Sequence, residues 1–575
     1  MKHLLIISSI LTVALSQQPI LSCSYFLIGD SYACDLTINN PNGLNNFTGI
    51  EGTHFEGFTN VDTELLYSSR GSVSTNVPSV ICETFPNLIR IQLYNIGLTE
   101  ISDTAFTGCS SLTELVLSSN RISSITANAF VELVAITTIN LNDNALTTLP
   151  ENVFADQKNL STLDLSLNQF ESIPASLFQP LENLQTLYLR YANLSVINNQ
   201  WFTSNVRLNS LNLASNRISV SEDSFNGLEG LRILNLDYNA ISEIPSHAFE
   251  PLRHLQHLFL IGNTVSELQE NSFSKLESLE ILDIGENPIS AIADGAFRGL
   301  DNLNVLSMSN CRLQQLNSTT FEHLRNLTFI SLNFNQIEAL PQNIFVHLPN
   351  ISYLGLWNNR LKTLRRNSFG SLSNLQTIDL EANVLNGLDR AIIDDAVSLD
   401  SMYFSGNLCA DSYFGNFVMS RAQHLLALER CFSNIRYIID VITEGDADYS
   451  FFDGLYPGIA LRVRTDNEVQ ISLTPFNFMW NPTIEIVIGS MNNTKSLIRV
   501  NQETVVAIVP TPNIVARDQW NDFRVTWANQ VILVYSGNNN LPFMGYTMQD
   551  FVPVNFYGLR AVHSRATWSV QPFGW

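Results

Sequence analysis

The chain has 575 residues and a formal net charge of −23 at pH 7, from 30 Lys and Arg against 53 Asp and Glu. This excess of acidic residues argues against nucleic acid and anionic membranes as partners. Residues 436–575 hold 9 basic and 12 acidic residues, so most of the negative charge lies in the earlier part of the chain. An acidic surface keeps secreted repeat proteins soluble, and we rank this explanation above a cation-binding role.

The first residues, MKHLLIISSILTVALSQQ, have the pattern of a secretory signal peptide. Lys2 supplies positive charge, residues 4–15 are apolar, and residues 14–16 resemble a small-residue cleavage site. The apolar run is too short to span a membrane, and no later run of about 18 apolar residues occurs. The C-terminal segment has no hydrophobic tail of the kind that a lipid-anchor signal needs. We therefore expect residues 1–16 to be a signal peptide and the mature protein to be secreted.

Residues 17–87 follow no regular pattern until a leucine repeat begins at Leu88, so we expect an N-terminal cap there. In a secreted chain the cysteines should pair. Cys23 and Cys34 would close a small loop within the cap. Cys82 and Cys109 lie at similar points before the first and second repeats, so a bond between them would join the first turns.

From Leu88 onward the chain repeats every 24 residues, with one step of 23. The stretches LTELVLSSNRI (112–122) and ITTINLNDNAL (136–146) share the template L-x-x-L-x-L-x-x-N-x-L, whose positions we number one to eleven. This template resembles the leucine-rich repeat, which implies an α/β solenoid over 88–409, a horseshoe with a parallel sheet on its concave face. The fourteen copies begin at Leu88, Leu112, Ile136, Leu160, Leu184, Leu208, Leu231, Leu255, Leu279, Leu303, Leu327, Ile351, Leu375 and Leu399.

Two further ladders run through the repeat. Position nine is Asn in eleven of the fourteen copies, and a buried Asn must form hydrogen bonds, here with the turn that leaves the strand. The exceptions are Ile96, Ala192 and Cys311, where we expect looser turns. A Phe recurs on the convex side and predicts a stacked spine, at Phe106, Phe130, Phe154, Phe178, Phe202, Phe225, Phe249, Phe273, Phe297, Phe321, Phe345 and Phe369.

Residues 410–435 have a helical pattern, and we expect them to cap the C-terminal end of the solenoid. Cys409 and Cys431 bracket the end of the last repeat and should form a third disulfide. Cys311 is the one cysteine without an expected disulfide partner, and we interpret it as a buried structural thiol. The chain has no C-x-x-C pair, which removes the usual zinc and redox motifs, so no metal and no cofactor are expected.

Positions three and five of each repeat should face the concave surface, because side chains alternate along a strand. They are mainly polar in repeats one to six and become apolar at position three from repeat seven onward. Exposed apolar rows mark contact surfaces, although rings on adjacent strands also pack on one another. We favour a contact surface over such packing. Its expected residues are Ile233, His257, Phe259, Ile261, Ile281, Val305, Phe329, Tyr353 and Trp357, with a neighbouring group of Tyr188, Arg190, Tyr191, Asp237 and Tyr238.

Other site types have weaker support. Asp164, Asp283 and Asp379 lie several repeats apart, which we expect to be too far for a catalytic carboxylate pair, and no catalytic residues are expected in the solenoid. N-x-S/T sequons predict glycosylation away from positions three and five. They occur at Asn46, Asn159, Asn193, Asn317, Asn326, Asn350 and Asn492.

At about residue 436 the repeat ends and short alternating runs begin, among them ALRVRT, EVQISLTP, TIEIVIGS, FRVTWA and QVILVYSG. Short runs of this kind, separated by turn residues, predict an all-β antiparallel, sandwich-like domain over 436–575. We expect Trp527, Phe543 and Trp568 to pack in its core. Arg499 and Arg524 are expected to pair with a buried carboxylate such as Glu485, or to hold an acidic ligand.

This domain resembles the farnesoic acid O-methyltransferase-like domain of invertebrate proteins. The resemblance rests on TIEIVIGSMNNTKSLIR (483–499), DFRVTW (522–527), VILVYSG (531–537), LPFMGY (541–546) and FYGLRA (556–561) followed by Trp568. Ser490-Met491 and Gly545-Tyr546 replace residues that include two Trp in the family pattern. The family name implies S-adenosylmethionine-dependent methyl transfer, but the usual methyltransferase fold needs a parallel α/β sheet and a Gly-rich loop, and this segment has neither pattern.

The sequence therefore favours a secreted, non-catalytic recognition protein. We expect it to bind an extracellular protein or glycan on the concave face, with the β domain as a second binding module, in innate recognition, signalling or adhesion. A homo- or heterodimer is compatible with this function. The alternatives are a farnesoic acid O-methyltransferase-type enzyme and a structural component of the extracellular matrix.

Overall fold

The computed structural model describes residues 21–40, 47, 49–68, 70–370, 372–434, 441–443, 450–453, 458–465, 468–474, 483–501, 503–515, 521–528, 530–537, 541–548, 554, 556–561 and 566–572. The predicted signal peptide and the Asn46 sequon lie outside these residues. The chain divides into two compact units, residues 1–428 and 429–575, which are described separately.

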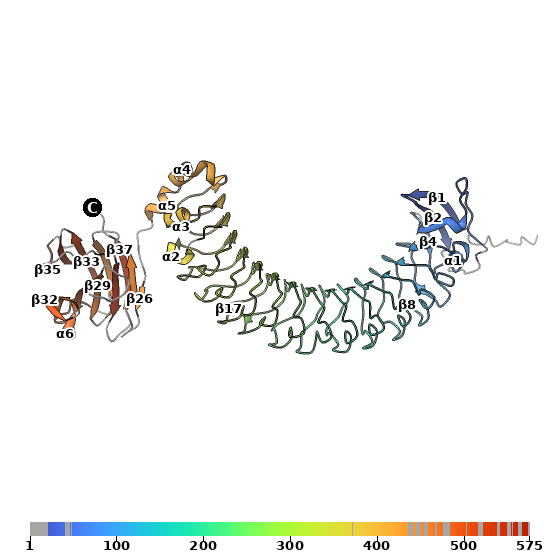
Figure 1. The fold of residues 1–575 in the computed structure, drawn as a ribbon, viewed down its shortest axis with the longest axis horizontal. Coiled ribbons are helices and arrows are strands. Elements are labelled where there is room, and N and C mark those ends of the chain that lie inside the picture. Colours follow the sequence, from blue (N-terminus) through green and yellow to red (C-terminus); the bar gives the residue numbers. More distant parts are fainter. Residues whose placement is uncertain are drawn as a thin grey trace, which may run out of the picture. The chain divides into compact units, whose positions relative to one another are not determined.

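The first unit is a solenoid in which each predicted repeat contributes one strand to a parallel sheet on the inner side of the curve (Figure 1). In every strand the middle residue, position four, is buried, because it points into the solenoid. Register is regular, so that position three pairs with position three of the next turn. The strands are β5 (Arg90–Gln92), β7 (Glu114–Val116), β9 (Thr138–Asn140), β10 (Thr162–Asp164), β11 (Thr186–Tyr188), β12 (Ser210–Asn212), β13 (Ile233–Asn235), β14 (His257–Phe259), β16 (Ile281–Asp283), β18 (Val305–Ser307), β19 (Phe329–Ser331), β20 (Tyr353–Gly355), β22 (Thr377–Asp379) and β24 (Ser401–Tyr403).

The predicted Asn ladder is present at all eleven positions and joins neighbouring turns. Asn263 is representative: its Oδ1 accepts a hydrogen bond from Ile241 N–H at 3.1 Å. Its Nδ2 donates to the carbonyls of Leu236 at 2.9 Å and Leu260 at 3.0 Å. Each amide thus satisfies backbone groups of its own turn and of the preceding one, which would otherwise be buried without partners.

The turn after each strand places position eight in the left-handed region. All fourteen residues there have φ between 50° and 74°, although only Gly262 and Gly406 are glycines. The residues preceding Ile96, Ala192 and Cys311 are Asn95, Tyr191 and Asn310, with φ of 53°, 50° and 56°. The expectation of looser turns at the three exceptions is therefore wrong for the backbone, because the stacked neighbours impose the same turn on every repeat.

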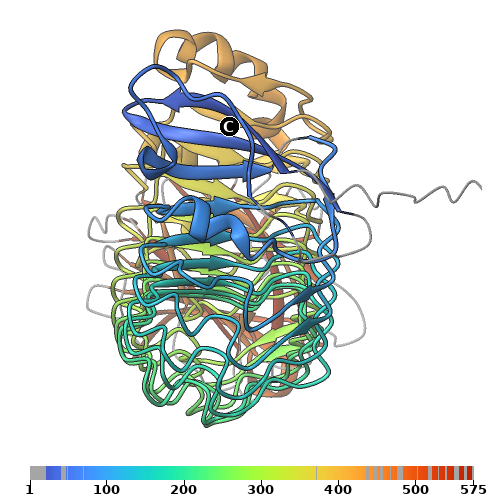
Figure 2. The same ribbon diagram turned by 90° about the vertical axis from the view of Figure 1, so that its right-hand side faces the viewer.

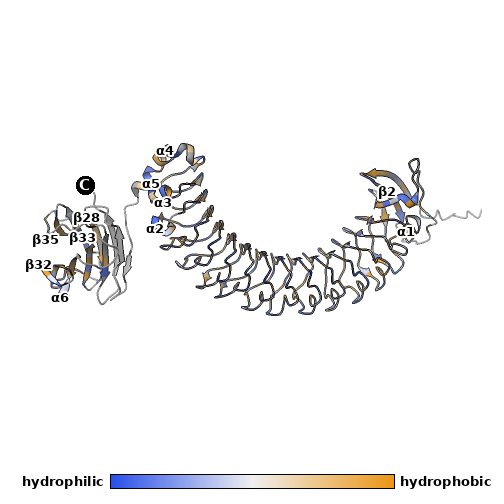
Figure 3. Cartoon of the chain, in the orientation of Figure 1, coloured by the Kyte–Doolittle hydropathy of each residue, from blue (hydrophilic) through white to orange (hydrophobic). Residues whose placement is uncertain are grey.

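The convex side carries the predicted aromatic spine. Phe130 stacks on Phe154 with ring centroids 5.8 Å apart, and Phe273 stacks on Phe297 at 6.3 Å. End-on, the turns superimpose on one another (Figure 2), and hydrophobic and hydrophilic residues alternate along each of them (Figure 3). Short elements on this side are β6 (Glu100–Ile101), β8 (Ser124–Ile125), β15 (Glu267–Leu268), β17 (Ala291–Ile292), β21 (Thr363–Leu364), β23 (Gly387–Leu388), α2 (Arg366–Phe369) and α3 (Arg390–Asp395).

The N-terminal end of the solenoid is covered by a hairpin. Its two strands are joined by a Cys23–Cys34 disulfide, and the second of them pairs in parallel with the first strand that follows. A Cys82–Cys109 disulfide links the next two turns, as predicted. The elements are β1 (Leu21–Ile28), β2 (Ser31–Asn40), the 3-10 helix η1 (Asn60–Asp62), β3 (Thr63–Ser68), β4 (Val73–Ser74) and α1 (Val80–Thr84).

Beyond the last repeat, β25 (Tyr413–Phe414) pairs antiparallel with β24, and α4 (Phe417–Ala427) follows. Cys409 and Cys431 are both disulfide-bonded, as predicted, and Cys431 lies in α5 (Glu429–Asn434) at the start of the second unit. Cys311 is buried and free, which confirms its interpretation as a structural thiol.

The second unit contains two six-stranded sheets, and its described strands pair antiparallel. Side chains from both sheets, including Leu461 and Ile486, form one buried core, which confirms the sandwich-like prediction. One sheet contains β26 (Val441–Thr443), β28 (Gly458–Arg464), β33 (Asn521–Ala528), β34 (Val531–Ser536), β35 (Met544–Thr547) and β37 (Ala566–Pro572). The other contains β27 (Ser450–Asp453), β29 (Val469–Thr474), β30 (Ile484–Gly489), β31 (Lys495–Val500), β32 (Thr504–Pro510) and β36 (Phe556–Ala561), with α6 (Ser490–Asn493) between β30 and β31.

The Asn ladder generates a stability prediction at Cys311. Its thiol approaches the carbonyls of Ile284 and Ser309 at 3.8 Å but offers no amide oxygen to the preceding turn. Cys311→Asn should restore the ladder and stabilise the protein by about 1 kcal/mol, the net value of a buried hydrogen bond. The reverse change at the next turn, Asn335→Cys, should cost about 2 kcal/mol, because it orphans backbone groups. Urea denaturation of both variants checks this, and destabilisation by Cys311→Asn would show that the site lacks room for the amide.

Candidate binding face

The predicted contact residues lie along the inner sheet, and their rings pack in pairs. Phe329 of β19 and Tyr353 of β20 stack with centroids 4.4 Å apart and planes 7° from parallel. Trp357, at position seven of the same repeat as Tyr353, meets Phe334 of the preceding repeat edge-on, with ring centroids 4.4 Å apart. Packing between adjacent strands therefore does occur, yet Trp357 and Phe334 remain 37% and 38% exposed. This part of the face keeps aromatic surface open to solvent.

The neighbouring aromatic group is more exposed. Tyr191 and Tyr238 are 50% and 51% exposed, and the Arg190 guanidinium lies 5.5 Å from the centre of the Tyr191 ring. Tyr238 extends across the next turn, where Gly262 leaves room: a Cβ there would lie 2.4 Å from the Tyr238 ring. The Tyr238 hydroxyl donates to Glu286 Oε2 at 3.4 Å. This contact joins repeats seven and nine across repeat eight.

Tyr191, Tyr238 and Phe334 occupy the left-handed position eight, with φ of 50°, 53° and 55°. Bulky residues are rare in this region, where non-glycine residues cost on the order of 1 kcal/mol. The same turn recurs in every repeat, so the repeat architecture imposes this strain, and what distinguishes the three positions is their exposed aromatic side chain. Sequence reasoning missed Phe334 and Glu286, because it included position eight only at Tyr191 and Tyr238 and did not extend it to the later repeats.

A hollow of about 380 Å³ lies between these aromatic groups, and we call it the central hollow. It exists because Gly285, Ser307 and Ser309 are small. Its lining is completed by Ile261, Asp283, Glu286, Asn310 and Phe334. Ile261 is the predicted contact residue that lines the hollow, and the other predicted contact residues are not part of its lining.

Acidic groups gather at this hollow. Burial, together with the charge of Glu286, raises the pKa of Asp283, although its Oδ1 accepts a hydrogen bond from Gly285 N–H at 3.0 Å. Burial, with the charges of Asp283 and Glu286, likewise raises the pKa of Asp237, whose Oδ1 accepts from Ile261 N–H at 2.7 Å. Asp283 is distant from Asp164 and Asp379 in sequence, as expected, but it is electrostatically coupled to these two nearer acids, which the sequence reasoning did not pair with it.

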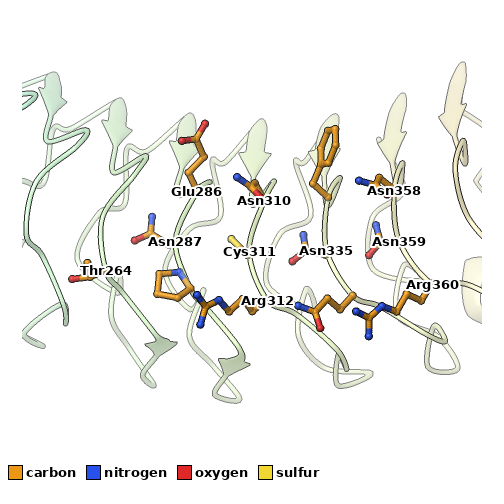
Figure 4. A pocket seen from close by; sticks show the side chains of 13 residues that line it. Thr264, Glu286, Asn287, Asn310, Cys311, Arg312, Asn335, Asn358, Asn359 and Arg360 are labelled. Atoms are coloured by element: carbon orange, nitrogen blue, oxygen red, sulfur yellow. The ribbon is translucent and has the colours of Figure 1, made fainter.

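A second hollow, of about 710 Å³, lies beside the strands on the flank of the same turns. Figure 4 shows Arg312 and Arg360 along its lower edge, the ladder residues Asn287, Asn335 and Asn359 behind it, and Glu286 at its upper edge. Glu286, Asn310 and Phe334 line both hollows, so the concave face and the flank form one continuous surface here. A third hollow, of about 350 Å³, is lined by Tyr191 and residues of repeats four to six.

The six sequon asparagines within the described residues are all exposed. Asn159, Asn326 and Asn350 donate through Nδ2 to a carbonyl of the preceding turn, at 3.0, 2.8 and 3.3 Å. Searching the described residues gives no cluster of three or more His, Cys, Asp or Glu arranged to hold a metal ion. Within the same residues, no helix is long and apolar enough to cross a membrane.

In the second unit, Arg499 forms an ion pair with Glu485, which is buried, as predicted. The Arg524 guanidinium lies 4.2 Å from the centre of the Tyr535 ring. Trp527 belongs to the core, and Phe543 packs against it, which confirms their predicted structural role. The side chain of Trp568 lies outside the described part of the chain.

Family models match both units. Residues 75–206 match the BspA-type leucine-rich repeat region in 6 copies, and segments between 207 and 408 match the leucine-rich repeat model. Residues 446–572 match the model described as farnesoic acid O-methyl transferase. No curated protein matches the sequence.

Solved structures share the solenoid fold. A leucine-rich-repeat protein of Leptospira interrogans is 25% identical with a TM-score of 0.52, over 60% of this chain and 84% of that one. The LRIM1/APL1C complex is 20% identical with a TM-score of 0.52, over 72% of this chain and 74% of the other. The Toll–Spatzle complex, described as a molecular hub in Drosophila development and innate immunity, is 20% identical with a TM-score of 0.50, over 60% of this chain and 54% of the other. At these identities the likeness to the two complexes shows the fold alone.

The acidic cluster generates a prediction about stability and pH. Folding raises the pKa of Asp283 above its usual value of 3.8. Between the pKa of the unfolded chain and that of the folded protein, the folded protein therefore binds more protons. The free energy of unfolding then falls as pH rises through this range. Asp283→Asn keeps the acceptor for Gly285 N–H and removes the charge. We expect its melting temperature to exceed that of the wild type at pH 7 and to match it near about pH 3.

The control for this prediction is Asp164→Asn, at the same template position in repeat four, where Asp164 Oδ1 accepts from Ser166 N–H at 2.9 Å. Its gain at pH 7 should be smaller. Differential scanning calorimetry across this pH range measures both variants, and equal gains would show that the acidic cluster has no special energetic cost.

Proposed function

Because the chain is a leucine-rich-repeat protein with a C-terminal domain of the farnesoic acid O-methyl transferase family, we propose that it is an extracellular recognition protein. It binds a protein or glycan partner on the concave face between repeats seven and twelve, in innate recognition, signalling or adhesion. The observation that carries this proposal is the exposed aromatic surface of Trp357, Phe334, Tyr238 and Tyr191 around the central hollow. Exposed aromatic side chains beside a hollow are the usual anchors of a binding interface.

The fold supports a binding role. A solenoid presents its repeated strands as one extended concave surface, and such surfaces serve as binding sites in repeat proteins. Two of the similar solved structures are complexes, Toll with Spatzle and LRIM1 with APL1C.

Secretion fits the cysteine chemistry. Six of the seven cysteines are in disulfides, which form and persist in oxidising compartments, and the free Cys311 is buried. The predicted signal peptide over residues 1–16 and the exposed sequon asparagines are consistent with an extracellular glycoprotein.

Binding of the partner on the concave face can be tested at the aromatic pair Phe329–Tyr353 and the neighbouring Trp357. Replacing all three with Ser should lower the affinity for the partner by at least about a hundredfold, because one hot-spot aromatic contributes about 2 kcal/mol or more and neighbouring ones add only in part. The three side chains are half-buried or exposed, so the variant should retain the circular dichroism of the wild type. The control is Tyr94→Ser, which removes a 55% exposed aromatic from the same template position as Trp357 in repeat one.

Partners for this comparison come from arrays of secreted and receptor ectodomains and of microbial glycans probed with the full chain. A partner that binds the triple variant as tightly as the wild type would place the binding site elsewhere on the molecule.

We assign the C-terminal unit a binding role as a second module. Its described strands pair antiparallel in two sheets, whereas a methyltransferase of the usual kind binds S-adenosylmethionine at a parallel α/β sheet with a Gly-rich loop. The Arg499–Glu485 pair is held within the sheet, since Glu485 is buried. This ion pair therefore has a structural explanation without a ligand.

Isothermal titration separates the binding module from the enzyme that the family description implies. With the full-length protein and S-adenosylmethionine we expect no heat of binding at concentrations up to the millimolar range. Binding of this cofactor at micromolar concentration, followed by methyl transfer to farnesoic acid, would identify an enzyme instead.

A further inference from the structure

Charge is distributed unevenly along the concave face. Positions three, five, seven and eight of repeats seven to fourteen include the acidic residues Asp237, Asp283, Glu286, Asp379 and Glu381, and no Lys or Arg. The first five repeats contain both signs at these positions, with Arg90 and Arg190 among them. At these template positions the aromatic half of the face therefore has no positive side chain, whereas Arg312 and Arg360 line the adjoining hollow on the flank.

The acids at the central hollow have no cationic partner. Among the described residues, Asp237, Asp283 and Glu286 form no ion pair with Lys, Arg or His. The groups that hydrogen-bond to them are neutral: backbone N–H groups and the side chains of Tyr238, Ser307 and Asn235. Two of the three are largely buried, with raised pKa values. Solubility alone explains acids on an open surface, but it does not explain carboxylates placed where burial and mutual repulsion make them costly.

The walls of the central hollow suit a cationic side chain. Asp283 and Glu286 of repeat nine and the exposed ring of Phe334 of repeat eleven lie on either side of the small residues Ser307 and Ser309 of repeat ten. Aromatic faces attract a cation, and paired carboxylates accept the forked N–H donors of a guanidinium. The volume of about 380 Å³ accommodates one long side chain rather than a large ligand. Tyr238, held across Gly262, fixes Glu286 on this wall.

We propose that the central hollow binds an arginine side chain of a basic protein partner, between Phe334 and the carboxylates of Asp283 and Glu286. This inference rests on the proposed function and names the chemistry of its partner. Arginine is favoured over lysine because its planar guanidinium both stacks on a ring and forms two parallel hydrogen bonds with carboxylates. The net charge of the chain, −23, supports attraction of a basic partner at long range.

Synthetic peptides provide the probe. Fluorescein-labelled hexa-arginine, hexa-lysine and hexa-citrulline are titrated with the full chain and followed by fluorescence anisotropy at about 0.05 M and about 0.5 M NaCl. Citrulline keeps the shape of arginine without its charge. We expect hexa-arginine to bind more tightly than hexa-lysine, hexa-citrulline not to bind, and high salt to weaken the interaction.

Two double variants then locate the site. Asp283→Asn with Glu286→Gln removes both carboxylates of the hollow and should weaken hexa-arginine binding by about tenfold or more. The matched control, Asp164→Asn with Asp143→Asn, removes the same charge from positions five and eight of the polar half, and should change affinity by less than about twofold. Circular dichroism confirms that each variant is folded.

Equal losses in the two double variants would overturn the proposal, because they would indicate diffuse attraction to an acidic solenoid. Hexa-arginine binding that is no tighter than hexa-citrulline binding would overturn it as well. Neither outcome contradicts the proposed function. That function is contradicted only if a partner found on the arrays binds the triple variant of Phe329, Tyr353 and Trp357 as tightly as it binds the wild type. A loss with Phe334→Ser comparable to that of the hollow variant would support the stacked arginine.

Discussion

The side-chain amide of position nine is the interaction on which the solenoid depends. Each of the eleven Asn residues accepts from the backbone of the preceding turn and donates to carbonyls of both turns, as Asn263 does between Ile241, Leu236 and Leu260. A turn that leaves a buried strand exposes backbone groups to a dry interior, where orphaned polar groups are costly. The amide satisfies them and, at the same time, fixes the distance and orientation of neighbouring turns.

This constraint shapes the face that we assign to binding. Because the turn is the same in all repeats, position eight is left-handed whichever residue occupies it, and its side chain stands at the edge of the concave sheet. Tyr191, Tyr238 and Phe334 therefore reach solvent beside the strands, while Gly262 lets Tyr238 cross to Glu286. The central hollow follows from the same regularity: three small residues, Gly285, Ser307 and Ser309, leave a gap between larger neighbours.

The second unit is built on a different principle. Its two antiparallel sheets enclose a core of branched aliphatic residues with Trp527, and its Arg499–Glu485 pair is embedded in one sheet. The solenoid exposes a long surface, whereas a sandwich of this kind presents loops and strand edges. Joined in one chain, the two units offer contact surfaces of different character, which fits a recognition role.

The sequence alone determined the architecture, because the 24-residue period fixes which side chains enter the solenoid and which strands pair. It also determined the disulfide pairs, the Asn ladder and the alternating strands of the β domain. It placed Phe329, Tyr353 and Trp357 on the concave face through the period of two in a strand. The backbone conformation of the turns at Ile96, Ala192 and Cys311 is set by the stacked neighbouring repeats and not by the residue at position nine. Tertiary structure alone brought Tyr238 to Glu286 across Gly262 and coupled Asp237 with Asp283, because these contacts join different turns and depend on the volumes of the side chains between them.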